Sequence, residues 1–562
     1  MIRVKSFMKV AFVIAFALVS GCMRKPEPVP IPGDAIMHAR MDNLADNWDK
    51  LKESQFFQQA EHWKLWDEPW MTEILQPYED FRLDFKRNTG LPFNETTFMM
   101  LFGKKVDMAL LPGQPLPSVV FIADLGKKST PIKKLNKGIT SLDKERLSTY
   151  DYKKHTVTVV KTKHPNALNN GEPTEIFYSF HRNRVISSSS RQGIEKVINV
   201  IVDGLPVLTE SPTYLELCNT IEKADLSFFG LPPEILKQVQ SSSSSFGMEI
   251  ESVPVQLKAF LSGASMVEKG INFQTAFIPV ENQKDVIDRV YMDRKAVKNA
   301  SKWLPAESIA GVAGGINLPG LIQHQKSILT AIPTEDGSNL WHTITWMLQE
   351  STGMDIPGEL ERWGGDGAFM VLENIRMATM IPIPELAIGF HADNKKLARA
   401  FSREVSQTIN DRFADSLGQM VEMELPGGNV YSYVPVPLVP GLQPGCCVID
   451  DYFIIGTAAT TVTSAYLAME GEQSRLFDSP DFTRLVEKNG DRLIMCKGAK
   501  PPKFAAAGKT ALDSLTLILM GAGQKPEIYR EILNSLETIP SAGFNLTLSD
   551  QHIVYNGFLE LL

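Results

Sequence analysis

The sequence predicts an α+β fold made of two tandem, internally duplicated modules, each a largely antiparallel sheet with packed helices. Three observations lead to this expectation: short apolar runs joined by turn-forming residues, helical periodicity between groups of these runs, and a second half that repeats the first. Strands joined by hairpins pair antiparallel, and helices between groups of strands favour an α+β arrangement. A single core stops growing near ~250–300 residues, so a chain of 562 residues is expected to hold two domains.

The internal repeat is the most informative pattern in the chain. Residues 184–230 can be laid without a gap on residues 452–498, at a constant offset of 268 positions. The matched pairs include Ile186 with Ile454, Leu208 with Leu476, Ser211 with Ser479, Tyr214 with Phe482, Leu217 with Leu485 and Gly230 with Gly498. Four further segments match in the same order, and five matches in order indicate a duplicated module.

The predicted boundaries follow from this repeat. The first module is expected at residues 34–285 and the second at residues 305–562. Residues 286–304 carry Val286, Val290 and Val297 at helical spacing, which predicts a connecting helix.

Both modules are expected to contain the same series of elements. Strands are predicted at residues 35–41, 106–111, 118–124 and 155–162, with hairpins at 176–189 and 445–457. Helices are predicted around Trp48 and Leu51, at 394–410 and at 461–470. A further helix in each module begins at a Ser-Pro pair, where Ser211 or Ser479 can cap the helix and Pro212 or Pro480 can occupy its first position.

The start of the chain is typical of an export signal. Arg3, Lys5 and Lys9 precede an apolar stretch at residues 10–19, which is shorter than a membrane span. The sequence "LVSGC" that follows resembles the lipobox of bacterial lipoproteins. This resemblance implies that residues 1–21 are a signal peptide, that cleavage occurs between Gly21 and Cys22, and that Cys22 carries lipid. The alternative is an ordinary secretory signal with a chance cysteine.

A lipidated Cys22 would tether the protein to a bilayer, because several acyl chains together give stable anchoring. Residues 22–33 alternate proline with other residues and are expected to form a stiff spacer between the lipid and the folded body. Met23 stands where lipoproteins kept in an inner membrane often have Asp. The expected location is therefore the cell envelope, on the periplasmic face of an outer membrane.

Composition excludes some partners and limits the chemistry of the cysteines. Without residues 1–21 the chain has 54 basic and 65 acidic side chains, a net charge of −11, which disfavours nucleic acid and anionic lipid as partners. Besides Cys22 the cysteines are Cys218, Cys446, Cys447 and Cys496. Adjacent cysteines pair only through a strained ring, so buried thiols are favoured over disulfides.

No motif in the sequence predicts a catalytic residue, a metal site or a cofactor, so we expect a protein that is not an enzyme. Gly508-Lys509-Thr510 ends like a phosphate-binding loop, but Lys503 occupies the position of the required glycine. The nine histidines show no metal-binding spacing. Asp450-Asp451 is expected in a hairpin turn, and the serine run Ser241–Ser245 in a flexible loop.

An aromatic cluster is the best candidate for a binding surface. It comprises Trp48, Phe56, Phe57, Trp63, Trp66 and Trp70. Its spacing fits two helices that bury aromatic side chains against the sheet, with the charged residues on the other side. The remaining exposed members, chosen from Trp63, Trp66 and Trp70, are the predicted contacts for a ligand or a partner protein.

The segments "PGDAIMHARMDNLADNWDKLKESQFF" and "SRLFDSPDFTRLV" resemble a family of bacterial exported proteins known only as a domain of unknown function. The resemblance implies an exported, repeated α+β body and supplies no catalytic residue. The second copy departs from the pattern, since "LPGLIQHQKSIL" has no tryptophan.

These observations lead to a main hypothesis and two alternatives. We expect a membrane-tethered envelope lipoprotein that acts without enzymatic activity as a scaffold or protein-binding surface, with the lipid bilayer and other envelope proteins as partners. The first alternative is a solute- or glycan-binding lipoprotein with a cleft between the two modules. The second is a hydrolase whose residues converge from distant loops.

Overall fold

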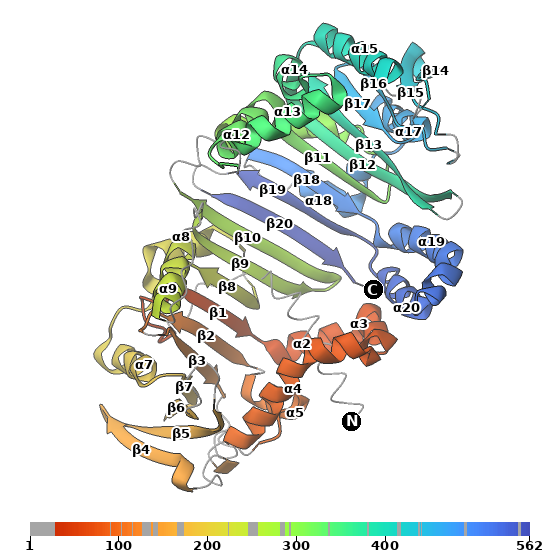
Figure 1. Cartoon of the computed structure of the whole chain (residues 1–562). Helices are drawn as coiled ribbons and strands as arrows, with labels where there is room; N and C mark the ends of the chain where they lie inside the picture. The colour runs from red at the N-terminus through yellow and green to blue at the C-terminus, as the bar shows by residue number, and fades with distance from the viewer. Residues whose placement is uncertain are drawn as a thin grey trace. The chain divides into compact units, whose positions relative to one another are not determined.

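The computed structural model describes residues 29–89, 91–102, 104–114, 116–125, 137–138, 144–165, 173–222, 224–245, 257–280, 287–291, 294–334, 338–378, 381–412, 418–436, 439, 441–487, 492–548 and 552–561. The chain forms two compact units (Figure 1). The first unit runs to Val280 and takes in Gln551–Asn556 and Leu561–Leu562, whereas the second comprises Glu281–Asp550 and Gly557–Glu560. The predicted signal peptide, Gly21 and Cys22 lie outside the described residues.

The first unit is built on an antiparallel sheet. Its strands are β1 (Met37–Asp42), β2 (Lys105–Leu111), β3 (Ser118–Asp124), β4 (Leu147–Tyr152), β5 (His155–Pro165), β6 (Pro173–His181), β7 (Arg184–Ser188), β8 (Leu226–Gly230), β9 (Leu257–Val267) and β10 (Gly270–Pro279). They pair in the order β4-β5-β6-β7-β3-β2-β1-β8-β9-β10. The sheet therefore grows from hairpins and meanders, as the sequence predicts.

Helices cover both faces of this sheet. They are α2 (Leu44–Glu53), α3 (Gln55–Ala60), η1 (Lys64–Asp67), α4 (Pro69–Thr89), α5 (Glu95–Phe102), η2 (Lys144–Arg146), α7 (Arg191–Asp203), η4 (Leu208–Glu210), α8 (Pro212–Thr220) and α9 (Pro232–Ser245). On one face, Ile194 and Val197 of α7 and Leu217 of α8 join the main core. On the other face, a smaller core includes Val106 and Ala123, with Phe85 of α4 packed against it.

The second unit has a sheet with the same strand order. Its strands are β11 (Ala310–Asn317), β12 (Gly364–Ala378), β13 (Ile381–Ala392), β14 (Val421–Leu425), β15 (Asn429–Tyr433), β16 (Gly445–Ile449), β17 (Tyr452–Gly456), β18 (Arg492–Ala499), β19 (Ala542–Leu548) and the Gly557–Glu560 part of β20 (Ile553–Glu560). They pair antiparallel in the order β14-β15-β16-β17-β13-β12-β11-β18-β19, and β20 pairs with β19.

The helices of the second unit are also distributed over two cores. They are α11 (Arg294–Ser301), α12 (Leu318–Thr330), α13 (Leu340–Thr352), α14 (Ile356–Trp363), α15 (Lys395–Arg412), η5 (Pro426–Gly428), α17 (Ala459–Glu470), η6 (Leu476–Asp478), α18 (Pro480–Glu487), α19 (Pro501–Gly521) and α20 (Pro526–Leu536). One core takes Val462 of α17 and Phe482 of α18, and the other takes Ile322 of α12 and Phe401 of α15. The predicted α+β class with largely antiparallel sheets is confirmed.

Residues 268 positions apart occupy equivalent places in the two units. Ile186 lies in the middle of β7 and Ile454 in the middle of β17, and both are fully buried. Tyr214 in α8 and Phe482 in α18 are likewise fully buried. These facts concern position and strand order, and the origin of the two modules by duplication stays a prediction.

Several local predictions agree with the structure. The Ser211 side chain accepts a hydrogen bond from Tyr214 N, and Pro212 begins α8. Asp450 lies between β16 and β17 with a φ of 48°. Its counterpart Arg182, between β6 and β7, has a φ of 54°, so both hairpins turn through the left-handed region.

Two local predictions need correction. The serine run Ser241–Ser245 is the last part of α9 rather than a loop. In place of one connecting helix at 286–304, α11 begins at Arg294 and ends at Ser301. Val297 and Ala300 of α11 belong to the core of the second unit. Gly508-Lys509-Thr510, which the sequence argues is not a phosphate-binding loop, lies within α19, where Lys509 pairs with Glu537.

The end of the predicted spacer, from Val29 to Gly33, also differs from the expectation. Val29 and Ile31 belong to the main core of the first unit. Ile31 O accepts a hydrogen bond from Leu208 N over 2.9 Å, and Gly33 N donates one to Pro206 O over 3.0 Å. The alternation of apolar residues with proline here forms an extended edge segment bound to the body, so a free spacer can extend only as far as residue 28.

Candidate functional site

The most unusual group of side chains in the described residues is a polar cluster inside the main core of the first unit. It comprises His38 and Arg40 from β1, Asp107 from β2 and Tyr214 from α8. All four are buried, with between 0% and 4% of their surface exposed. Arg40 and Asp107 are direct partners in the β1–β2 register, and His38 lies on the same face because strand side chains alternate.

Asp107 is the centre of the cluster. Its Oδ1 accepts a hydrogen bond from Arg40 Nε over 2.8 Å and lies 2.9 Å from His38 Nε2. Tyr214 OH lies 3.4 Å from His38 Nδ1. The two ring nitrogens of His38 thus contact the carboxylate on one side and the tyrosine hydroxyl on the other. Arg40 Nη2, by contrast, is a buried atom with no hydrogen-bond partner among the described residues.

The electrostatics of the cluster favour charged Arg40 and Asp107. Burial by itself raises the pKa of the Asp107 carboxyl, but the hydrogen bond from His38 and the charge of Arg40 outweigh it and hold this pKa at about 2. Burial opposes the charge on Arg40, yet the neighbouring Asp107 carboxylate raises the pKa of the guanidinium overall. Burial also raises the pKa of Tyr214, which keeps this hydroxyl protonated. The cluster is thus a closed ion pair in the core, out of reach of a substrate.

The second unit has an apolar cluster at the corresponding inward positions. Gly311 and Ala313 of β11 are buried where β1 has His38 and Arg40, and Phe369 of β12 is buried opposite Ala313, where β2 has Asp107. Phe369 and Phe482 are almost fully buried members of that core. A Cβ on Gly311 would lie 2.9 Å from Leu476 Cδ2, so this position has no room for a larger side chain. The polar cluster is therefore a property of the first unit.

The aromatic cluster lies on the helices between β1 and β2. Trp48 and Phe57 make an edge-to-face contact at 5.7 Å, and both are buried. Trp66 is also buried, stacks on the half-buried Trp63 at 6.0 Å, and donates from Nε1 to Ala60 O over 2.7 Å. These contacts confirm the core-packing interpretation for Trp48 and Trp66.

Trp70 is the exposed member of the aromatic cluster. It lies near the start of α4 with 51% of its surface exposed, and Ile74, one turn later, is 50% exposed. The neighbouring Met71 is buried, so α4 turns one apolar side inward and leaves a second one in solvent. Of the three tryptophans predicted as contacts, Trp70 is accessible, Trp63 partly so, and Trp66 is not.

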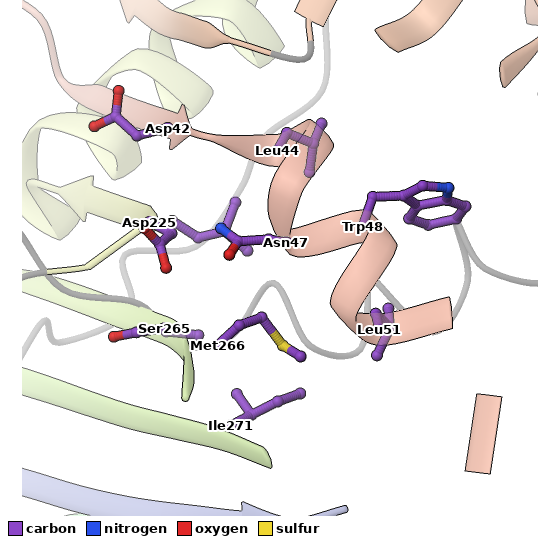
Figure 2. A pocket seen from close by; sticks show the side chains of 11 residues that line it. Asp42, Leu44, Asn47, Trp48, Leu51, Asp225, Ser265, Met266 and Ile271 are labelled. Atoms are coloured by element: carbon purple, nitrogen blue, oxygen red, sulfur yellow. The ribbon is translucent and has the colours of Figure 1, made fainter. Parts of the chain in front are cut away.

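A small cavity lies beside this helical region (Figure 2). Helix α2 carries Leu44, Trp48 and Leu51 next to the strand ends that carry Met266 and Ile271. The volume of this cavity is about 50 Å³. Sites for drug-sized ligands occupy roughly 300–1,000 Å³, so this cavity is too small for one.

Further apolar side chains are exposed on the second unit. Trp346 and Met347 lie exposed on α13, and Leu517, Ile518 and Met520 on the last turns of α19. None of the helices that the structure describes has both the length and the apolar character needed to cross a bilayer. Within the same residues, no three or more His, Cys, Asp or Glu side chains are grouped as a metal site.

The sequence did not predict the polar cluster as a unit. The signal was present in "MHARMD", where His38 and Arg40 occupy the inward positions of a strand. Their partner Asp107 is 67 residues away from Arg40, and only the strand pairing brings it to them.

The chain has no sequence match among known proteins and only weak structural matches. No protein-family model matches the chain, and no curated protein matches it in sequence. Among solved structures, crystal form IV of TP0453 is similar at a TM-score of 0.25 and 8% identity, over 47% of this chain and 85% of that chain. Crystal form I of TP0453 gives a TM-score of 0.25 and 9% identity, over 46% and 81% of the two chains.

Proposed function

We propose that the protein is a lipid-anchored lipoprotein of the bacterial cell envelope that binds other envelope proteins through a surface on α4. The observation that carries the binding proposal is the exposure of Trp70 and Ile74, one helical turn apart. Tryptophan is enriched at the energetic centres of protein interfaces. The anchor is supported by the sequence around Cys22.

The surroundings of Trp70 and Ile74 fit an interface. Farther along α4, Gln76 donates a hydrogen bond to Asp80, and Arg82 pairs with Glu79 over 2.6 Å. Such polar pairs form the rim that surrounds an apolar interface centre. The wall behind the surface is rigid, because Met71 and Trp66 are packed in the interior.

The anchor is tested with the native protein and a Cys22→Ala variant. Mass spectrometry of the mature amino terminus is expected to show an acylated Cys22, and the native protein is expected to sediment with envelope membranes. The Cys22→Ala form should remain unprocessed or appear in the soluble fraction. An unmodified amino terminus on the membrane-bound native protein would refute the anchor.

The binding surface is tested by site-specific photo-crosslinking in intact envelopes. A photoreactive residue at position 70 is expected to give a discrete adduct with another protein. Thr72 is a matched control, since it is also exposed on α4 but points to a different side of the helix. Equal adducts from positions 70 and 72, or none from position 70, would contradict the proposed surface.

A further inference from the structure

The point at which the chain enters the folded body limits how far the body can be from the lipid. From Val29 onward the chain is bound to the first unit, through the core contacts of Val29 and Ile31 and the hydrogen bonds to Leu208 and Pro206. Six residues separate Cys22 from Val29. A residue spans at most ~3.5 Å, so the distance from Cys22 to Val29 cannot exceed about 25 Å.

The surface next to this entry point is the end of α7. Gly33 N is bonded to Pro206 O, and Lys196 of α7 pairs with Asp34 over 2.6 Å. Four residues lead from Val29 to Gly33, which places Gly33 within about 14 Å of Val29, and Pro206 lies three residues after the last residue of α7. A bilayer that holds Cys22 is therefore within reach of this surface.

The end of α7 carries exposed aliphatic side chains. Val202 and Leu205 are each 47% exposed, on either side of Gly204, which ends the helix with a φ of 65°. Both are held in place, because Val200 of the same helix and Leu208 after it are buried in the unit. Exposed aliphatic groups on a rigid support insert readily into the boundary between headgroups and acyl chains.

Side chains of both charges lie beside these two residues. The turn between β4 and β5 contains Lys153 and Lys154, and Lys153 pairs with Asp203 at the end of α7. Tyr152 OH donates to Asn199 Oδ1 over 2.9 Å, which holds the turn against the helix. The exposed Lys154 can lay its aliphatic stem along the apolar boundary of a bilayer while its ammonium group stays at the level of the headgroups.

We propose that the end of α7, with Val202, Leu205 and Lys154, rests on the bilayer that holds the lipid anchor. This inference depends on the proposed function, since it requires acyl chains at Cys22. Its consequence is an orientation: the opposite face of the first sheet, which α4 covers, is turned away from the lipid and remains accessible to other proteins.

The test uses full-length lipidated protein in phosphatidylethanolamine–phosphatidylglycerol vesicles with lipid-borne quenchers. An environment-sensitive fluorophore is attached at Leu205→Cys, and in a matched sample at Leu83→Cys, which is 43% exposed on α4. We expect quenching several-fold stronger at position 205 than at 83. Adding Val202→Asp should lower the quenching at 205 several-fold, whereas Leu83→Asp should leave it unchanged.

The outcomes separate this inference from the proposed function. Equal quenching at positions 205 and 83, in protein whose acylated Cys22 is verified by mass spectrometry, would overturn the orientation and leave the anchor intact. Unchanged quenching at 205 in the Val202→Asp protein would also overturn it. Absence of acyl chains from Cys22 would instead refute the proposed function. Thermal unfolding of each variant establishes that the exposed substitutions leave the body folded.

Discussion

Arg40 and Asp107 face each other across the β1–β2 pair, and Arg40 Nε donates a 2.8 Å hydrogen bond to Asp107 Oδ1 in the interior of the first unit. Buried ion pairs stabilise little over an apolar pair of similar volume, but an isolated buried charge is very costly. The second unit illustrates the apolar solution, with Ala313 and Phe369 at the corresponding positions. The ion pair is therefore sensitive to the loss of either partner alone.

The first prediction concerns single and paired substitution of these residues. Asp107→Leu leaves the Arg40 charge buried without its acceptor and should lower the free energy of unfolding by ~3–5 kcal/mol. Arg40→Met combined with Asp107→Leu removes both charges and should cost less than Asp107→Leu alone. Urea denaturation followed by circular dichroism measures both values. Arg40→Met alone completes the comparison. A double variant whose loss of stability equals the sum of the losses in Arg40→Met alone and Asp107→Leu alone would contradict the role of the buried charge.

The second prediction is a dependence of stability on acid. The pKa of Asp107 is about 2 in the folded protein and ordinarily near 3.8. Because the folded pKa is depressed, the stabilisation is fully present above pH 4 and is lost as the pH falls towards 2, by about 2 kcal/mol in total. Thermal unfolding between pH 2 and 5 should show a steeper loss for the native protein than for the Arg40→Met/Asp107→Leu variant. Parallel curves for the two proteins would argue against it.

The third prediction distinguishes two tryptophans of the aromatic cluster. Trp66 is buried, and Trp66→Ala should destabilise the protein by ~3–5 kcal/mol through the cavity it leaves. Trp70 is half exposed, and Trp70→Ala should change stability by less than ~0.5–1 kcal/mol. Chemical denaturation measures both. A large loss of stability in Trp70→Ala would show a packing role and weaken its assignment to a binding surface.

The fourth prediction concerns thiol reactivity. Cys446, Cys447 and Cys496 are buried thiols, and burial raises the pKa of each of them. Burial likewise raises the pKa of the half-buried Cys218, to about 12. Since the thiolate is the reactive form, these groups should react with a disulfide reagent at pH 8 only as fast as the protein unfolds. Leu205→Cys is the exposed control and should react at once. Rapid modification of the native thiols without denaturant would contradict their burial.

Local patterns in the sequence determined much of the secondary structure. The hairpin at residues 176–189, the cap at Ser211 and the turn at Asp450 depend on residues only a few positions apart, so they can be recognised from the chain alone. The α+β class follows from the same signals. Ser241–Ser245 was misjudged because serine is a weak helix former, whereas the packing of α9, including the hydrogen bond from Gln238 Nε2 to Gly113 O, keeps this segment helical.

The sequence by itself determined the α+β class, several of the strands and helices and the 268-residue correspondence, because periodicity, caps and turns are short-range properties of the chain. Only the tertiary structure decided that Asp107 meets His38 and Arg40, that Trp66 is buried while Trp70 is exposed, and that the proline-rich segment from Val29 belongs to the core. Each of these outcomes depends on strand register or on which helix covers which face. Such relationships join residues far apart in the sequence, and they are set by the packing of the whole unit.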